Sequence, residues 1–399
     1  MRRTGRWSVG VALLAAAVVA AAFVGVGRAT SEAKAPIVIG YAYDSKGQMS
    51  PFDVPALAAA QLQIQAINAK GGVNGRRLRM ITCDTQNNNP AKAKSCAASM
   101  LDKGAKILFV TCDVEFSAPA TQEAINRGIL AVAPCIGTDQ MGPKRFGARG
   151  RLAFSYGNVA QDEGSAMAEY AYRRGWRRAS IATDNLLIYF KNVTAAFEKR
   201  FTQLGGRIAT KESYTSGDKT IQNVVSRLNA QRADVIVTSE AFGELPAMVS
   251  GLRSLGNNTP ILNSWAGDGT YWVPKEPKVT NYYYVTFASA FGDDPSPAVR
   301  ALVNKLKAQG KAPATGGFVT GAAAVDGVVT AIKRAKGSTS GARLALIMES
   351  YKNVPAIGGN VSFSKKLHTV FGRQYRVMQI QDNKAKYIGT VRAKVVPTL

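Results

Sequence analysis

The stretch from Ile37 to Met80 limits the fold most, because it joins an apolar strand, a polar loop, a helix and a second strand. The strand is the run 37–39, and the loop 44–52 that follows it is rich in Gly and Ser. In the helix, apolar residues recur every three or four positions, and Gln and Asn occupy the other face. Such a unit opens a parallel α/β sheet, and it places the loop at the carboxyl end of the first strand, where these sheets bind ligands.

Short apolar runs continue to alternate with helical patterns along most of the chain. The pattern breaks between Gly142 and Gly157, and a second series of the same kind then runs from Asp162 to the loop NSWAGDG at 263–269. We therefore predict an α/β protein made of two doubly wound parallel-sheet lobes.

Residues 1–35 have the layout of a secretory signal peptide. Three arginines precede an unbroken run of small and apolar residues, 9–26, and further small residues follow it. Cleavage is expected between Gly27 and Ala35. The alternative is an uncleaved anchor helix, since about 18 apolar residues nearly suffice to span a bilayer. The rest of the chain is expected outside the cytoplasm, in the periplasm or on the extracellular side of the cell surface.

Two runs carry a family resemblance: IGYAYDSKG at 39–47 and INAKGGVNGRRLRMITCDT at 67–85. They closely resemble the start of the type I periplasmic binding proteins of branched-chain amino acid ABC transporters, the leucine/isoleucine/valine-binding proteins. The resemblance covers nearly the whole chain after the leader and is strongest in 37–135. It implies a venus-flytrap fold, in which a three-strand hinge joins the two lobes.

The resemblance and the breaks in the pattern together suggest where the lobes begin and end. The first lobe is expected to comprise 36–155 and 288–355, and the second lobe 156–287 and 356–399. The chain would then pass between the lobes near residues 142–157, 287–290 and 355–360. The strands predicted after residue 360 are expected to join the second lobe.

The net charge of +25, from 51 Lys and Arg against 26 Asp and Glu, favours anionic partners. The basic residues are scattered along the chain and accompany no nucleic-acid-binding motif, so nucleic acid is not expected as a partner. Anionic membrane lipids or cell-wall polymers are the preferred explanation.

All four cysteines follow the leader, and an even number in an exported chain favours two disulfides. Cys83 ends a predicted strand and Cys96 lies on the next helix, whereas Cys112 and Cys135 end strands that are expected to be neighbours in one sheet. Of the pairings that four cysteines allow, we therefore predict Cys83–Cys96 and Cys112–Cys135. Metal binding is the alternative, but no CxxC motif occurs and the single histidine, His368, lies far away in the sequence.

No catalytic constellation is recognised. The sequence has no GxSxG, P-loop, GxGxxG or HExxH motif, and His368 lies on a carboxyl-terminal segment away from the predicted ligand loops. The adjacent carboxylates Asp162-Glu163 and Asp293-Asp294 are expected to be solvated or helix-starting residues. The sequence therefore predicts a binding protein without enzymatic activity, cofactor or metal.

The resemblance implies which residues face a ligand. In the family, an aromatic wall and two carboxylate-binding loops come from the first lobe, while aromatic residues and an ammonium-binding glutamate come from the second. The matching first-lobe residues are Phe52, Asp113, Phe116, Ser117, Cys135 and Gly137, and the matching second-lobe residues are Tyr189, Phe242, Trp265 and Asp268.

Two of these positions depart from the family pattern. The run CDVEFS at 112–117 places two carboxylates where the family has hydroxyl donors, and Trp265 stands at or near the family's ammonium-binding glutamate. The ligand is therefore expected to carry more positive charge or more hydroxyls than an aliphatic amino acid, as a polyamine, an amide or a modified amino acid would. Phe52 and Phe242 also suit packing against the lobe cores, and Asp113 also suits capping of the helix after it.

The sequence thus predicts an exported solute-binding protein, expected to be a monomer. It would capture a small polar metabolite between its lobes, such as an amino acid, an amide or a related compound, and deliver it to an ABC transporter permease. The alternative is an extracellular ligand sensor or surface-interaction protein with the same fold and no transport role.

Overall fold

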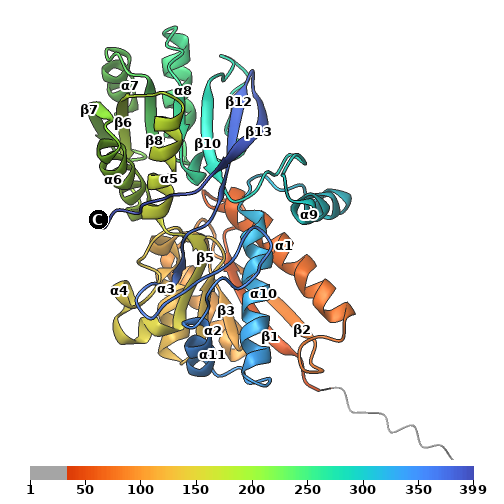
Figure 1. Ribbon diagram of the computed structural model, residues 1–399. Coiled ribbons are helices and arrows are strands. Elements are labelled where there is room, and N and C mark those ends of the chain that lie inside the picture. The colour runs from red at the N-terminus through yellow and green to blue at the C-terminus, as the bar shows by residue number, and fades with distance from the viewer. Residues whose placement is uncertain (1–33) are drawn as a thin grey trace, which may run out of the picture. The chain divides into compact units, whose positions relative to one another are not determined.

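Two sheets, each covered by helices on both faces, organise residues 34–399, the part of the chain that this computed structural model describes (Figure 1). The expected signal peptide at 1–35 lies outside these residues, apart from its last two positions. Within the described part, no helix combines the length and the apolar character needed to cross a membrane.

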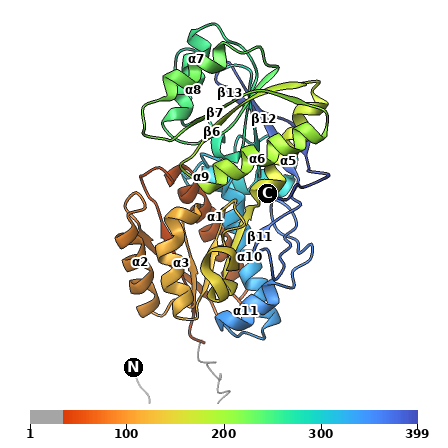
Figure 2. The ribbon, with the colours of Figure 1, turned by 90° about the vertical axis from the view of Figure 1, so that its left-hand side faces the viewer.

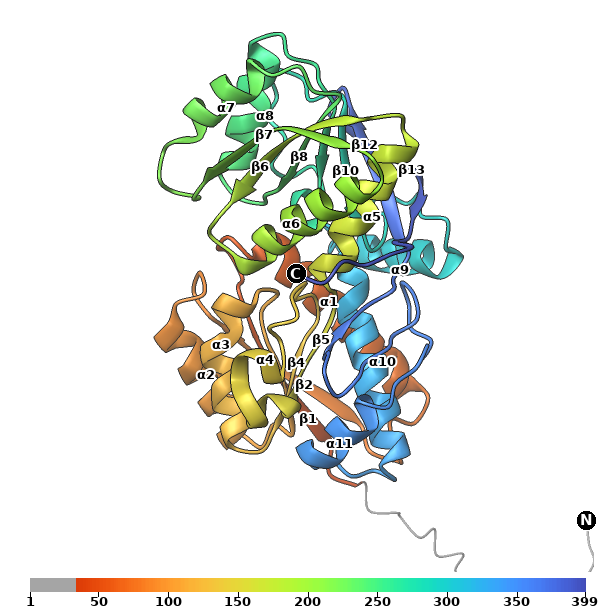
Figure 3. The same cartoon turned by 60° about the vertical axis from the view of Figure 1, so that its left-hand side comes forward.

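The first sheet has the strand order β11-β5-β4-β3-β1-β2, and all its pairings are parallel. Its strands are β1 (Ile37–Tyr43), β2 (Leu78–Asp84), β3 (Ile107–Phe109), β4 (Leu130–Ala133), β5 (Ala153–Asn158) and β11 (Thr369–Val370). The helices around it are α1 (Ser50–Ala69), α2 (Pro90–Asp102), α3 (Val114–Asn126), α4 (Pro143–Phe146), the 3₁₀ turn η1 (Gly147–Leu152), α10 (Phe318–Arg334) and α11 (Gly341–Met348). Helices α2 and α3 cover one face, and α1 and α10 cover the other (Figure 3).

The second sheet has the order β13-β12-β10-β9-β8-β6-β7 and is parallel except for the two strands β12 and β13. Its strands are β6 (Arg178–Asp184), β7 (Arg207–Tyr214), β8 (Val235–Ser239), β9 (Ile261–Asn263), β10 (Tyr282–Thr286), β12 (Tyr375–Gln381) and β13 (Lys384–Val391). Its helices are α5 (Ala160–Arg173), α6 (Ile188–Gln203), α7 (Ile221–Asn229), α8 (Glu244–Ser254) and the 3₁₀ turn η2 (Trp265–Gly267). Helices α5 and α6 pack together on one face of this sheet, and α7 and α8 lie on the other (Figure 2).

This architecture confirms the predicted α/β fold of two doubly wound lobes. The inner strands are short and buried, as expected for parallel sheets covered on both faces, whereas the edge strands β2, β7 and β13 are partly exposed. The chain passes from the first sheet to the second after Asn158, and it returns through residues 287–317, which include α9 (Pro297–Ala308).

The chain makes its third passage between the lobes later than the expected boundary at 355–360. Strand β11 pairs with β5 in the first sheet, so the chain leaves that sheet only after Val370. Val361 and Phe363 also pack in the first lobe's core rather than in the second. The segment 356–370 therefore belongs to the first lobe, and only β12 and β13 extend the second sheet.

In one of the two acidic pairs that were expected to be solvated or to start a helix, one residue belongs to a buried ion pair. Asp294 is fully buried and accepts two hydrogen bonds of 3.1 Å each from the guanidinium of Arg376 on β12. Its neighbour Asp293 is exposed, as expected. The bidentate pair ties the passage after β10 to β12, a contact between segments about 80 residues apart that local sequence patterns do not reveal.

Both predicted disulfides are confirmed. Cys83 at the end of β2 is bonded to Cys96 on α2, with Cα atoms 5.5 Å apart. Cys112 and Cys135 follow the neighbouring parallel strands β3 and β4, and their Cα atoms lie 4.8 Å apart. The second bond joins two loops at the carboxyl edge of the first sheet.

Replacing both Cys83 and Cys96 by Ala is expected to lower the free energy of unfolding by about 3 kcal/mol. The bond closes a loop with a sequence separation of 13 residues, and its loss restores that loop's entropy to the unfolded chain. Urea unfolding of the variant against the wild type measures the change. An unchanged unfolding midpoint would mean that the bond does not stabilise the fold.

Candidate ligand-binding site

A narrow cavity lies between the loops at the carboxyl ends of the two sheets. Its volume is about 20 Å³, and both lobes contribute to its wall. The lining residues are Met49, Phe52, Cys112, Asp113 and Gly137 from the first lobe and Leu187, Tyr189, Phe190, Ala241, Phe242, Trp265 and Ala266 from the second. These loops meet because right-handed crossovers place every loop that follows a parallel strand on the same edge of its sheet.

Aromatic rings form most of the wall. Phe52, in the first turn of α1, packs edge-on against Trp265 of the second lobe, with ring centroids 4.9 Å apart. Trp265 in turn lies 6.4 Å from Tyr189, and Phe190 lies 5.8 Å from Phe242. All five side chains are at most 7% exposed. The two lobes therefore touch through desolvated aromatic surface at the cavity.

Gly137 permits the closest approach between the lobes. A Cβ atom at this position would lie 2.5 Å from the ring of Tyr189, well inside van der Waals contact. Gly137 follows β4 of the first lobe, and Tyr189 lies in the first turn of α6 in the second. Only a residue without a side chain fits between this loop and the tyrosine ring in this arrangement.

Glu163 supports the aromatic wall from behind. The hydroxyl of Tyr189 donates to its Oε2 at 2.9 Å, and the backbone N–H of Trp265 donates to its Oε1 at 2.6 Å. The side chain is fully buried, and this burial raises the pKa of Glu163 to about 8. Asp162 beside it is only 1% exposed and accepts hydrogen bonds from Asn158 and from the backbone of Gly372.

Of the two positions expected for Asp162 and Glu163, the helix start is confirmed and the solvated position is wrong. Both residues lie in the first turn of α5, directly after the first passage between the sheets, and this turn faces the interior. An acidic first turn is favourable on an exposed helix too, so the local sequence pattern does not distinguish the two situations.

Six of the ten residues expected to face a ligand line the cavity: Phe52, Asp113, Gly137, Tyr189, Phe242 and Trp265. Asp113 also caps α3, because its Oδ1 accepts hydrogen bonds from the backbone N–H groups of Glu115 at 2.8 Å and Phe116 at 3.3 Å. Both interpretations of this aspartate thus describe its position. Sequence reasoning did not place the other six lining residues at the ligand, although Phe190 directly follows Tyr189. These are Met49, Cys112, Leu187, Phe190, Ala241 and Ala266.

The other four expected residues lie outside the lining. Cys135 is bonded to Cys112, which lines the cavity in its place. The hydroxyl of Ser117 turns back to the carbonyl of Val114 in its own helix, and Phe116 packs half-buried beside the core.

Asp268, the fourth of these residues, holds the return passage in place. Its Oδ2 accepts a hydrogen bond of 2.6 Å from the hydroxyl of Thr286 at the end of β10 and another from the backbone N–H of Gly316. The carboxyl is 1% exposed, and burial raises the pKa of Asp268 to about 7. It joins two segments of the return passage rather than facing the cavity.

His368 has a structural position, consistent with its expected distance from the ligand loops. Its ring stacks on Phe154, with centroids 4.1 Å apart, and its Nδ1 lies 2.9 Å from the carbonyl oxygen of Ala153. The side chain is 1% exposed, and burial lowers the pKa of His368.

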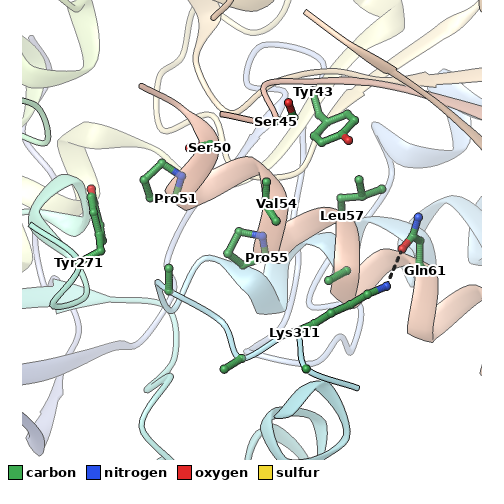
Figure 4. Close-up of a pocket in the computed structure, with 14 residues that line it drawn as sticks. Tyr43, Ser45, Ser50, Pro51, Val54, Pro55, Leu57, Gln61, Tyr271 and Lys311 are labelled. Carbon is green, nitrogen blue, oxygen red and sulfur yellow. Dashed lines mark hydrogen bonds between the residues drawn. The ribbon is translucent and has the colours of Figure 1, made fainter. Parts of the chain in front are cut away.

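A larger hollow of about 570 Å³ opens at the surface beside α1 (Figure 4). It is lined by the outer side of α1, by Tyr43 and Tyr271, and by the segment that carries Lys311. The ammonium of Lys311 reaches the amide oxygen of Gln61 at 3.5 Å across it. None of the ten expected site residues lines this hollow, although Tyr271 packs edge-on against Phe52.

Comparisons with known proteins agree with this geometry. The sequence pattern of the family described as "Periplasmic binding protein" matches residues 36–385. The Leu/Ile/Val-binding protein homolog 3 of Brucella melitensis is 23% identical over 338 residues, which cover 84% of this chain and 89% of that protein.

Solved structures show the same fold. The branched-chain amino acid substrate-binding protein LivJ of Streptococcus pneumoniae, in complex with isoleucine, has a TM-score of 0.78 at 19% identity, covering 90% of this chain and 99% of that one. A solute-binding protein of an ABC transporter from Rhodopseudomonas palustris, in complex with 3,4-dihydroxybenzoic acid, has a TM-score of 0.75 at 15% identity, covering 91% and 99%. The resemblance inferred from the sequence is thereby confirmed.

Glu163→Gln is expected to remove part of the pH dependence of stability. Because the pKa of Glu163 is raised from 4.5 to about 8 in the folded protein, the folded state holds a proton that the unfolded chain releases between these values. Stability is therefore lost as the pH rises through this window, by at most about 1.4 kcal/mol per pH unit for one proton. Glutamine stays neutral, so the unfolding free energy of the Glu163→Gln variant should fall less steeply with pH over the same range.

Urea unfolding at a series of pH values measures this slope. Glu276→Gln is the matched control, because its side chain is 72% exposed and contacts only Lys278 at the surface. Parallel stability curves for the wild type and Glu163→Gln would contradict the raised pKa.

Proposed function

This chain belongs to the periplasmic binding protein family, and from that premise we propose that it is an exported solute-binding protein of an ABC transporter. In this proposal it captures a small metabolite between its two lobes and delivers it to the membrane permease. The observation that carries the proposal is the cavity whose wall is built from both sheets' ligand loops. Its proposed ligand is an amino acid, an amide or a related compound, in line with the ligands of its relatives.

The proposed mechanism is closure of the lobes by a population shift. A ligand placed at this cavity contacts Phe52 and Asp113 of the first lobe together with Tyr189, Phe242 and Trp265 of the second only when the lobes are together. Its affinity for that arrangement exceeds its affinity for separated lobes, so binding favours the closed form. The permease would then recognise the bound protein by the spacing of its lobes.

In this proposal the protein is exported and acts near an anionic cell surface. Residues 1–35 would direct secretion and be removed, and the remaining protein would act as a monomer outside the cytoplasm. Its excess of basic residues would favour contact with anionic lipids or cell-wall polymers. Relatives in the family are binding proteins, and we propose no catalytic role for this chain.

A thermal-shift screen over amino acids, amides, polyamines and small carboxylates tests the proposal. A true ligand at 100 times its Kd should stabilise the native state by about 2.7 kcal/mol, which appears as a raised unfolding temperature. If no small solute shifts the transition at saturating concentration, the solute-binding proposal fails.

Gly137→Ala is expected to weaken the ligand found in that screen about fivefold to hundredfold. Its added methyl group would meet the Tyr189 ring and oppose the joined arrangement, and overpacking of this kind costs about 1–3 kcal/mol. Titration calorimetry gives the affinity. The matched control is Gly243→Ala, where the same methyl group has no atom within 4 Å although the residue follows the cavity-lining Phe242. If the two variants bind the ligand with equal affinity, the ligand does not bind at this cavity.

A further inference from the structure

The cavity wall contains an acidic side chain and no basic one among the described residues. Of the residues that line it, Asp113 is the only acidic one, and within the described part of the chain no Lys, Arg or His lines it. The remaining wall is apolar or aromatic, with five aromatic side chains. A ligand enclosed here therefore meets one carboxyl group and several ring faces, which carry partial negative charge.

Several backbone donors beside the cavity, in the loops after β3, β8 and β9, are already engaged by carboxyl groups of the chain itself. Loop N–H groups at the ends of strands and the starts of helices are the usual partners of such an anion. Here buried acidic side chains of the chain itself accept them. The pairs are Cys112 N to Asp53 at 2.8 Å, Ala241 N and Phe242 N to Glu240 at 2.9 and 2.7 Å, and Trp265 N to Glu163 at 2.6 Å.

The helix cap engages only part of the Asp113 carboxyl group. Both backbone donors of the cap bind Oδ1, and the carboxyl also lies within hydrogen-bonding reach of the Glu115 side chain. Burial and the neighbouring Glu115 raise the pKa of Asp113, and a positive charge beside Asp113 would favour its ionised form. Arg145 lies near this pair, with its guanidinium 3.7 Å from Oε1 of Glu115.

We propose that the ligand of this cavity is a small organic cation, held by Asp113 and by the faces of the surrounding aromatic rings. A cation over a desolvated aromatic face gains about 2 kcal/mol, and a charged hydrogen bond to Asp113 adds to this. An anion would instead oppose Asp113 and find the backbone donors of Cys112, Ala241, Phe242 and Trp265 occupied. This inference rests on the proposed solute-binding function and deepens it by naming the charge class of the ligand.

Two isosteric series test the charge directly by titration calorimetry on the wild-type protein. The first is leucinamide, leucine and 4-methylvalerate, and the second is benzylamine, benzyl alcohol and benzoate. The cationic member of at least one series is expected to bind about tenfold or more tightly than its neutral or zwitterionic partner, and the anionic member is expected to bind most weakly.

The variant Asp113→Asn tests whether Asp113 holds the cation. Asparagine is also a good helix cap, so the variant keeps the hydrogen bonds to Glu115 and Phe116 and should fold. Its affinity for the cation is expected to fall about tenfold to hundredfold. The control is Asp102→Asn, which removes a carboxylate that contacts only Arg127 at the surface and should leave the affinity unchanged.

The outcomes separate this inference from the function on which it rests. Tighter binding of the neutral or anionic members, or full cation affinity in Asp113→Asn, would overturn the charge inference and leave solute binding intact. If no member of either series binds and no solute of the thermal-shift screen shifts the unfolding temperature, both the solute-binding proposal and the charge inference are overturned.

Discussion

The arrangement of the cavity depends on the buried carboxyl group of Glu163. The hydroxyl of Tyr189 and the backbone of Trp265 come from loops more than 70 residues apart, and they converge on its two oxygens. Because both rings line the cavity, this one side chain fixes the aromatic surface that the second lobe presents to Phe52. Burial raises the pKa of Glu163 to about 8, so at neutral pH hydrogen bonds rather than a full charge hold these loops.

The same solution recurs at two other loops beside the cavity. A loop at the end of a parallel strand carries backbone N–H groups that are costly to bury without a partner. In this chain Asp53 and Glu240 supply those partners at the ends of β3 and β8, each from a fully buried position. The N–H groups of Cys112, Ala241 and Phe242 are therefore satisfied by the chain itself, which helps to fix the shape of these two loops.

Much of the fold was predictable because its signals are local. Apolar runs of strand length and helical spacing indicated the two lobes. The disulfide pairings then followed from a strand end and its following helix for Cys83–Cys96 and from two neighbouring strands for Cys112–Cys135. The passage after Val370 was missed because β11 has only two residues, too few for a periodic pattern. At the site, the family resemblance placed Phe52 and Tyr189 at the cavity. The burial of Glu163 was missed, because it depends on how the helix docks and not on its own sequence.

The contact between Phe52 and Trp265 has a consequence for ligand choice. It joins the lobes through the chain's own aromatic surface, and such a pair contributes about 0.5–1.5 kcal/mol beyond the area it buries. The joined arrangement is thus partly stabilised before a ligand takes part, and the remaining space is only about 20 Å³. A ligand that enters must displace some of this packing, so it favours the joined lobes only if it replaces those contacts with stronger ones. An aliphatic group exchanges one apolar contact for another, whereas a cation against Asp113 and the ring faces adds an electrostatic attraction that the aromatic packing alone does not supply.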